Sequence, residues 1–166
     1  MPLQPAVTDI ELLKDRPAVA CLLSGLPGVL QAAKFDRDEL TLWVDHLRVV
    51  EALRLLRDSE TTGFKALADV TAVDWLPSEP RFEVVYSLLC YERRERLRVK
   101  VKISGTDPYL ESVTSLWPGA SPFEREIFDL FGIRFQGHPD LRRILLPDDW
   151  EGHPLRKDHP VTGTRV

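Results

Sequence analysis

The sequence lacks the residue patterns on which most small cofactor-binding proteins depend. Its 166 residues include two cysteines, Cys21 and Cys90, which lie far apart and outside any C-x-x-C motif. This excludes a disulfide framework, a zinc ribbon and a conventional cysteine-ligated iron–sulfur cluster held by this chain alone. The glycine-rich nucleotide-binding signatures, the G-x-S-x-G elbow and the H-E-x-x-H metal motif are also missing.

Long apolar runs and an excess of positive charge are absent too. No run approaches the roughly 20 residues of a membrane helix, and residues 1–16 carry prolines and acids where a signal peptide needs an apolar core. The net charge of −4 offers no general attraction for nucleic acid or acidic lipid. With 43% hydrophobic and 29% charged residues, we expect a soluble globular protein of a reducing compartment.

Apolar periodicity predicts an α+β fold. Helices are expected at Thr8–Lys14, Pro17–Ser24, His46–Asp58 and Ser121–Phe131, with a short helical turn and then extended chain over Leu67–Trp75. Two β-hairpins are expected, at Val29–Val44 and Phe82–Ile103. The predicted architecture is a two-layer sandwich of short helices on a mixed sheet built from these hairpins, followed by an extended C-terminal arm.

One predicted strand has a cationic face. Apolar residues alternate there with Arg96, Arg98, Lys100 and Lys102, so the basic side chains share one side of the sheet. Such a face is a docking surface or, more commonly, the solvated side of the sheet.

The chain changes character at Ile133. Prolines recur beyond it without helical or strand periodicity, yet leucine, tryptophan and charged residues remain frequent. A disordered tail is poorer in large apolar residues. We therefore predict a compact domain over residues 1–132 and an arm over residues 133–166, which becomes ordered by lying on its own domain or on a partner.

Two groups of residues could carry chemistry. His138, His153 and His159 lie near aspartates, but their spacing fits no common metal motif, so hydrogen bonds from the imidazoles to the backbone are favoured. Three acids crowd the last predicted helix: Glu124, Glu126 and Asp129. Acid–base catalysis is the alternative to a structural role. In the structural role, Glu124 forms a capping box with Ser121, and Arg125 pairs with Asp129.

The strongest signal lies in residues 124–160, which read EREIFDLFGIRFQGHPDLRRILLPDDWEGHPLRKDHP. The motifs E-R-E-x-x-D-x-F-G-I, G-H-P-D-L-R-R-I-L and G-H-P-L-R-K-D closely resemble the signature of the C subunit of NADH–quinone oxidoreductase, the 30 kDa family of respiratory complex I. The upstream segments 72–75, 82–86 and 112–117 agree in order. Pro122 and His159 depart from the family, which often has tryptophan and an aromatic residue there.

The resemblance implies a peripheral-arm subunit on the cytoplasmic face of the bacterial inner membrane. In that family the subunit binds no cofactor, whereas the whole complex uses FMN, iron–sulfur clusters, NADH and quinone and pumps protons. Its arm would lie along the D subunit, which helps to form the quinone pocket, with the B and I subunits as further partners. The alternatives are an equivalent subunit of a membrane-bound hydrogenase or other quinone-reducing complex, and a free-standing hydrolase that uses Glu124, Glu126 and a histidine.

We predict no catalytic, cofactor or metal residues in this chain. Of the adjacent pair Arg142 and Arg143, one is expected to face the acids of the chain's own domain and the other the partner, because neighbouring residues of extended chain point to opposite sides. The predicted interface residues are Glu124, Arg125, Glu126, Asp129, His138, Arg142, Arg143, Trp150, His153, Arg156, Lys157 and Asp158.

Overall fold

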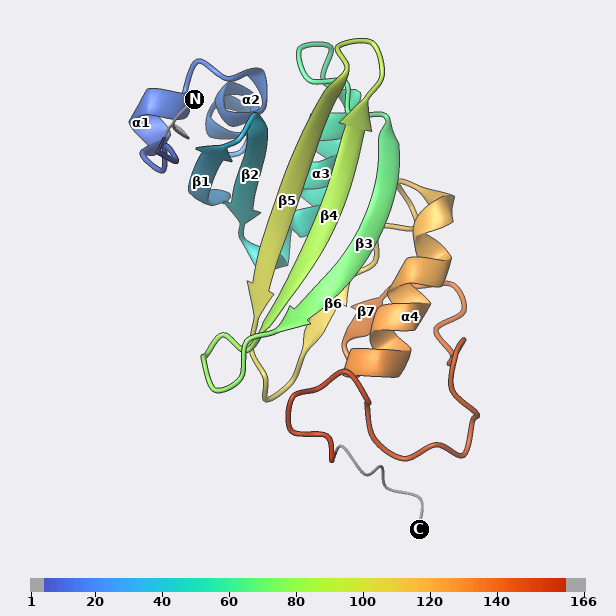
Figure 1. Ribbon diagram of the computed structural model, residues 1–166. Helices are drawn as coiled ribbons and strands as arrows, with labels where there is room; N and C mark the ends of the chain where they lie inside the picture. The colour runs from blue at the N-terminus through green and yellow to red at the C-terminus, as the bar shows by residue number, and fades with distance from the viewer. Residues whose placement is uncertain (1–4, 161–166) are drawn as a thin grey trace.

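A mixed five-stranded sheet with the order β1-β2-β5-β4-β3 is the centre of the fold (Figure 1). The computed structural model describes residues 5–160. Each predicted hairpin is present: β1 (Leu30–Asp36) pairs with β2 (Glu39–Val44), and β4 (Phe82–Cys90) pairs with β5 (Glu95–Ile103). The hairpins join through the parallel pair β2 and β5, which makes the sheet mixed as predicted.

Short helices cover one face of this sheet. They are α1 (Ile10–Leu13), α2 (Pro17–Gly25), α3 (Val49–Asp58) and α4 (Ser121–Phe131), with short 3₁₀ turns, η1 (His46–Arg48) and η2 (Pro118–Ala120), before the last two. In Figure 1, α3 lies behind the sheet, α4 lies beside β3, and no helix lies in front of β3, β4 and β5. The predicted two-layer α+β arrangement is therefore confirmed. None of the helices within residues 5–160 has the length and hydrophobicity to span a bilayer.

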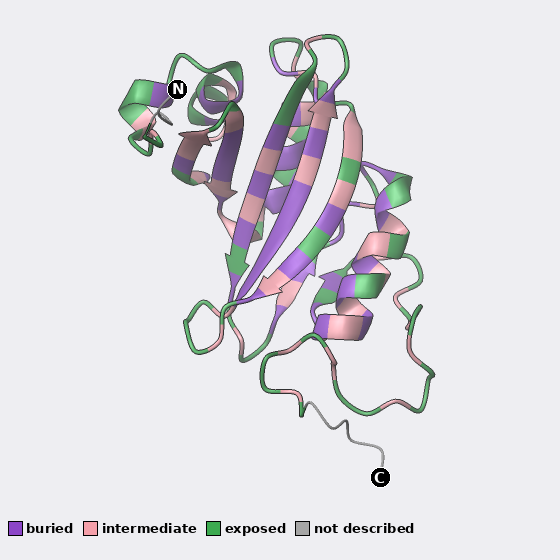
Figure 2. Ribbon diagram, viewed as in Figure 1, coloured by how far each residue is buried: buried purple, intermediate pink, exposed green. Residues whose placement is uncertain are grey.

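Both layers share one hydrophobic core. The strand β4 contributes alternate residues, including Phe82, Tyr86 and Leu88, which are almost completely buried (Figure 2). The apolar stripe of α3 packs against them, and α4 adds Phe131, whose ring meets that of Phe82 edge to face at 6.5 Å. Burying each such side chain stabilises the fold by roughly 1.5–3 kcal/mol. The core thus fixes α4, the helix on which the arm lies, against the sheet.

Two expectations about local structure are wrong. Residues 66–74 contain no helical turn and form the edge strand β3 (Ala66–Asp74), because antiparallel pairing with β4 continues along its length. At the start of α4, Ser121 is the first helical residue rather than the cap, since Ala120 precedes the helix and makes no side-chain cap bond. The predicted capping box with Glu124 is therefore absent.

The compact part of the chain extends beyond residue 132. Strand β7 (Arg134–Gln136) pairs in parallel with β6 (Tyr109–Glu111), and Ile133 and Phe135 are buried in the core. The predicted boundary falls four residues too early, because pairing with β6 supplies a partner that the sequence of β7 does not reveal. We therefore use "arm" below for residues 137–160, the described part of the extended segment.

Gly132 ends α4 with a left-handed conformation, φ +70°, as its position predicts. A Cβ atom there would also lie 2.4 Å from His153 Nε2, so the glycine admits the arm to the end of the helix.

We expect Gly132→Ala to lower the free energy of unfolding by about 3 kcal/mol, since strain adds to displaced arm contacts. Gly28→Ala is the control for strain alone, because its φ is +79° with no atom within 4 Å of the added Cβ. It should cost about 1 kcal/mol. Equal urea midpoints for the two variants would show that the close approach of His153 to Gly132 does not contribute to the free energy of unfolding.

Candidate functional site

The carboxylate of Asp129 holds the arm on α4. This side chain is completely buried, and its Oδ2 accepts hydrogen bonds from the backbone N–H groups of Ile144, Leu145 and Leu146 at 2.8–3.0 Å. Its Oδ1 accepts from Arg143 Nη1 at 2.7 Å. Consecutive backbone N–H groups that converge on one anion form a nest. Here the anion belongs to the domain and the nest belongs to the arm.

This arrangement lowers the pKa of Asp129. Burial by itself raises the pKa of a carboxyl group, but the three backbone N–H groups and the Arg143 guanidinium stabilise the charged form more strongly. A depressed pKa means that the contact stabilises the folded state above the pKa of unfolded aspartate. That contribution is lost as the pH falls through the folded pKa, so acid should release the arm.

A second cluster fixes the end of the arm to the loop between β3 and β4. Asp74 is buried at the end of β3 and accepts two hydrogen bonds from Arg81, at 2.7 and 3.0 Å, and one from the backbone N–H of Lys157 at 2.8 Å. Arg81 also donates to both carboxylate oxygens of Asp158, at 2.7 and 2.9 Å. Its guanidinium holds the pKa of Asp74 well below the usual range.

The arm also caps the C-terminal end of α4. The last carbonyl groups of a helix have no partners within the helix. Three of them accept hydrogen bonds from the arm. Asp129 O accepts from His153 Nδ1 at 2.9 Å, and Leu130 O accepts from the backbone N–H of Leu155 at 3.1 Å. The third, Phe131 O, accepts from Arg156. Because a carbonyl only accepts, His153 carries a proton on Nδ1. Burial lowers the pKa of this imidazole.

Arg156 completes the cap and connects it to the core. Its Nε donates to Phe131 O at 2.6 Å, and its guanidinium lies 5.3 Å from the centre of the Phe82 ring. Arg81 lies over the same ring at 4.9 Å. Two cation–π contacts therefore converge on one core phenylalanine, one from the arm itself and one from the loop that binds the arm.

Arg125, one turn before Asp129 on α4, also binds the arm. It donates to the backbone carbonyls of Arg142 and Arg143, at 3.1 and 2.9 Å, and not to Asp129. The predicted Arg125–Asp129 pair is therefore wrong, because Asp129 is occupied by the arm. As predicted, the two adjacent arginines diverge. Arg143 faces Asp129, whereas the side chain of Arg142 is 70% exposed and pairs with Asp140.

The structure brings half of the predicted interface residues together, but within the chain. Side chains that hold the arm belong to Arg125, Asp129, Arg143, His153, Arg156 and Asp158. The remaining residues are placed differently. Lys157 bonds mainly through its backbone, the carbonyl of Trp150 accepts from Arg143, His138 Nε2 lies 3.4 Å from Ser121 O, and Glu126 and Arg142 are exposed. Their role at an interface with a partner stays a prediction.

Glu124, another residue of α4, makes no hydrogen bond with the described arm and binds Ser112 and Val113 instead. It is fully buried and accepts hydrogen bonds from Ser112 Oγ at 2.6 Å and the backbone N–H of Val113 at 2.7 Å. Burial raises its pKa to about 7 despite these donors. The hydroxyl of Tyr86 is also buried and has no hydrogen-bond partner in the described part of the chain. Burial first, and the charge of Glu124 second, raise the pKa of Tyr86.

Sequence reasoning missed Arg81 and the function of Asp74. A signal existed for Asp74, since it continues the buried alternation of Val70 and Ala72 along β3, where an acid needs a buried partner. Nothing in the sequence marks Arg81, which follows a proline-rich loop. Among residues 5–160, no three His, Cys, Asp or Glu side chains are grouped so that they could hold a metal ion.

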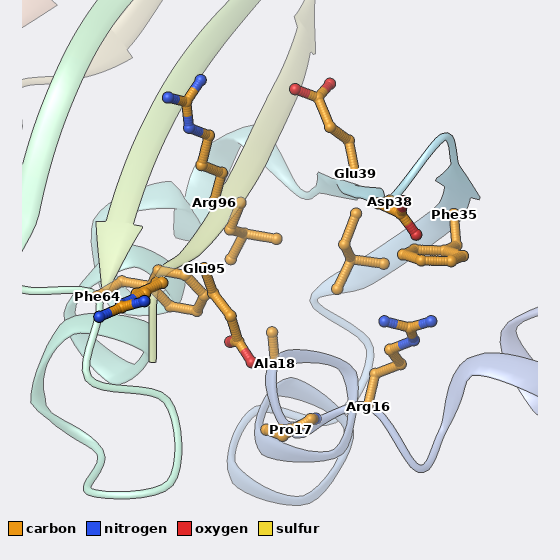
Figure 3. Close-up of a pocket in the computed structure, with 12 residues that line it drawn as sticks. Arg16, Pro17, Ala18, Phe35, Asp38, Glu39, Phe64, Glu95 and Arg96 are labelled. Carbon is orange, nitrogen blue, oxygen red and sulfur yellow. The ribbon is translucent and has the colours of Figure 1, made fainter. Parts of the chain in front are cut away.

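A pocket of about 280 Å³ lies elsewhere, between the start of α2, the β1–β2 turn and the start of β5 (Figure 3). Arg16 stacks over the Phe35 ring at 3.5 Å there, and both signs of charge line the walls, including Arg96 and Glu95 of β5. None of the predicted site residues lies in it. The predicted site residues gather instead on the arm and on α4.

Comparison with known proteins identifies the family. The model of the family "Respiratory-chain NADH dehydrogenase, 30 Kd subunit" matches residues 42–165. The chain belongs to this family, as its motifs predicted. It is 48% identical to the C subunit of the NADH-quinone oxidoreductase of Roseiflexus castenholzii, over 92% of this chain and 88% of the relative. It is 48% identical to the C subunit from Citrifermentans bemidjiense, over 92% and 93%.

Two solved structures agree with the fold. A trypsin-resistant fragment of Nqo5 is 37% identical, with a TM-score of 0.54 over 62% of this chain and 83% of the fragment. A chain of the membrane-bound sulfane sulfur reductase, an archaeal respiratory membrane complex, is 28% identical, with a TM-score of 0.72 over 91% of this chain and 85% of that one.

We expect Asp129→Asn to release the arm while the domain stays folded. The substitution removes the charge opposite the largely buried Arg143 and replaces one of the two acceptor oxygens by an NH₂ donor, so either Arg143 or the backbone N–H groups lose their acceptor, which costs roughly 3–5 kcal/mol. The trypsin cleavage rate at Arg143 and Arg156 should rise at least about 100-fold. Asp140→Asn, at an exposed ion pair, is the control and should change little. Unchanged cleavage of Asp129→Asn would show that the arm is held by its other contacts.

The raised pKa of Glu124 should make the free energy of unfolding depend on pH in an unusual way. Its folded pKa lies above the unfolded value of 4.5, so the folded state binds the proton more tightly. Between about pH 4.5 and 7 its contribution should fall with rising pH by about 3 kcal/mol in total. Glu124→Gln should remove this slope in urea unfolding measured from pH 4.5 to 8. An unchanged slope would assign the pH dependence to other groups.

Proposed function

We propose that this chain is a cofactor-free structural subunit of a proton-pumping NADH–quinone oxidoreductase, held at the cytoplasmic face of the bacterial inner membrane. It supports the D subunit, which helps to form the quinone site, and also contacts the B and I subunits. FMN, the iron–sulfur clusters, NADH and quinone are bound by other subunits. The proposal rests on family membership and on the arm, whose polar groups bond within the chain while several of its apolar groups face outward.

The outward apolar residues of the arm carry this proposal. Ile144, Leu145 and Leu155 are 41%, 60% and 50% exposed, although the backbone N–H groups of all three bond to α4. The arm is thus fixed in a conformation that presents aliphatic side chains away from the domain. Preformed apolar segments of this kind lose little conformational entropy on binding, which suits a permanent protein interface.

The solved Nqo5 fragment offers a parallel. It is a trypsin-resistant fragment, and it aligns with 62% of this chain. A folded domain with a more protease-sensitive remainder is what we expect of a subunit whose arm is less protected in the free chain than in the assembled complex. The free chain should therefore be cut first within residues 137–166.

An equivalent role in a different respiratory complex is the alternative. The similarity to a chain of the membrane-bound sulfane sulfur reductase covers 91% of this chain, so the same fold occurs in a complex with another name and reaction. The genes next to this one separate the two possibilities, since complex I places genes for the B and D subunits beside it. The free-standing hydrolase is disfavoured, because Glu124 is buried whereas Glu126 is exposed, so the two carboxylates do not face one site.

Arg142→Glu tests the support role. Arg142 is exposed on the arm beside the outward leucines, so charge reversal should lower the amount of assembled complex about tenfold or more and leave the urea stability of the free chain unchanged. Turnover per assembled complex should stay near normal. Native gels with NADH–quinone assays measure both quantities, and Arg54→Glu on the exposed side of α3 is the matched control.

Two results would contradict the proposal. Normal assembly with lost turnover would mean that the chain takes part in the chemistry. Failure of a tagged wild-type chain to copurify with the B and D subunits would exclude the proposed complex.

A further inference from the structure

The side of the sheet opposite the helices is uncovered in Figure 1, and it is not an ordinary solvated face. Glu83 and Val85 point to this side from β4, yet they are only 2% and 8% exposed. Val85 lies outside the main core cluster, which is formed on the helical side. A solvated sheet face has no need of a buried acid.

A fixed network buries Glu83. Its carboxylate accepts hydrogen bonds from Trp43 Nε1 at 2.7 Å and Lys100 Nζ at 2.8 Å, and Lys100 lies 5.4 Å from the centre of the Trp43 ring. These three side chains come from β4, β2 and β5, so they brace the middle of the sheet. The result is a rigid surface with an indole at its centre.

The positive charges around this network are only partly compensated. Glu39 pairs with Arg98, Glu83 with Lys100, and Asp36 with Lys34. Arg96 and Lys102, by contrast, make no ion pair with any residue from 5 to 160. They share one face of β5 and are six residues apart, which corresponds to roughly 20 Å along a strand.

A groove runs beside Lys102. It has a volume of about 530 Å³ and is lined by Lys34, Trp43, Trp75 and Lys102, among others. Trp75 is 46% exposed, a large fraction for an indole. The exposed indole of Trp75 fits a protein interface, where tryptophan is enriched.

We propose that this face, centred on Trp43 and bounded by Arg96 and Lys102, binds an acidic segment of a neighbouring protein subunit. The segment lies along β5, places carboxylates against Arg96 and Lys102, and covers Trp43 and Trp75 with apolar side chains. This contact is separate from the arm, so the subunit is held on two sides. It rests on the proposed function, because it needs a complex to supply the partner.

Charge decides between the possible occupants. A second copy of this chain would bring two sets of cations together, which is repulsive. Residues 1–4 and 161–166, which flank the described part of the chain, contain no Asp or Glu that could pair with these cations. The partner must therefore supply carboxylates from outside this chain.

A zero-length carbodiimide tests the contact in the native complex. This reagent joins lysine to a carboxylate only within ion-pair distance, so Lys102 should be linked to an Asp or Glu of another subunit and be protected from acetylation compared with the free chain. Lys65 on the β3 side is the internal control for reagent access. Equal acetylation of Lys102 in both states, without a link to another subunit, would overturn the inference.

Charge reversal tests how much this contact contributes to assembly of the complex. The double variant Arg96→Glu with Lys102→Glu should lower assembled complex about tenfold or more compared with the control pair Arg54→Glu with Lys65→Glu. Urea midpoints of the free chains should match, since neither Arg96 nor Lys102 makes an ion pair that folding needs. Normal assembly of the double variant overturns this inference alone, whereas a wild-type chain that enters no complex overturns the proposed function as well.

Discussion

The buried carboxylate of Asp129 is the contact on which the C-terminal part of the molecule depends. It satisfies three consecutive backbone N–H groups and one guanidinium of the arm. An extended segment cannot supply its own backbone partners, so it needs an external acceptor to stay in place. A single carboxylate does this because its two oxygens can accept several hydrogen bonds, and its depressed pKa keeps it charged at neutral pH.

The other arm contacts extend this principle. The cluster of Asp74 and Arg81 receives residues 157 and 158, and the carbonyl groups at the end of α4 receive His153, Leu155 and Arg156. Polar groups of the domain thus fix the backbone of the arm, while aliphatic side chains of the arm remain outside. The arm is therefore ordered by its own domain before a partner binds it, whereas in many interfaces the partner both orders and binds such a segment.

The buried acids of this chain serve different ends through different surroundings. Asp129 and Asp74 meet guanidinium groups and backbone N–H groups, which lower their pKa values. Glu124 meets only a hydroxyl and one backbone N–H, and its pKa is raised. Glu83 lies on the side of the sheet that the helices leave uncovered. There it is paired with Lys100, one of the cations of that face. Composition alone would have grouped these acids together.

The sequence by itself determined the fold class, both hairpins, most helices and the family, because period-two and helical patterns are local and the motifs of the last third are specific. It also determined that Arg142 and Arg143 point to opposite sides. Tertiary structure decided the rest. β3 is a strand through its pairing with β4, β7 belongs to the domain through its pairing with β6, and Glu124 turns inward to Ser112. Asp129 binds an arm fourteen or more residues away rather than Arg125 one turn before it. Local rules rank contacts within a helix, but a buried carboxylate goes to the strongest set of donors that the folded chain brings to it, and those donors are distant in sequence.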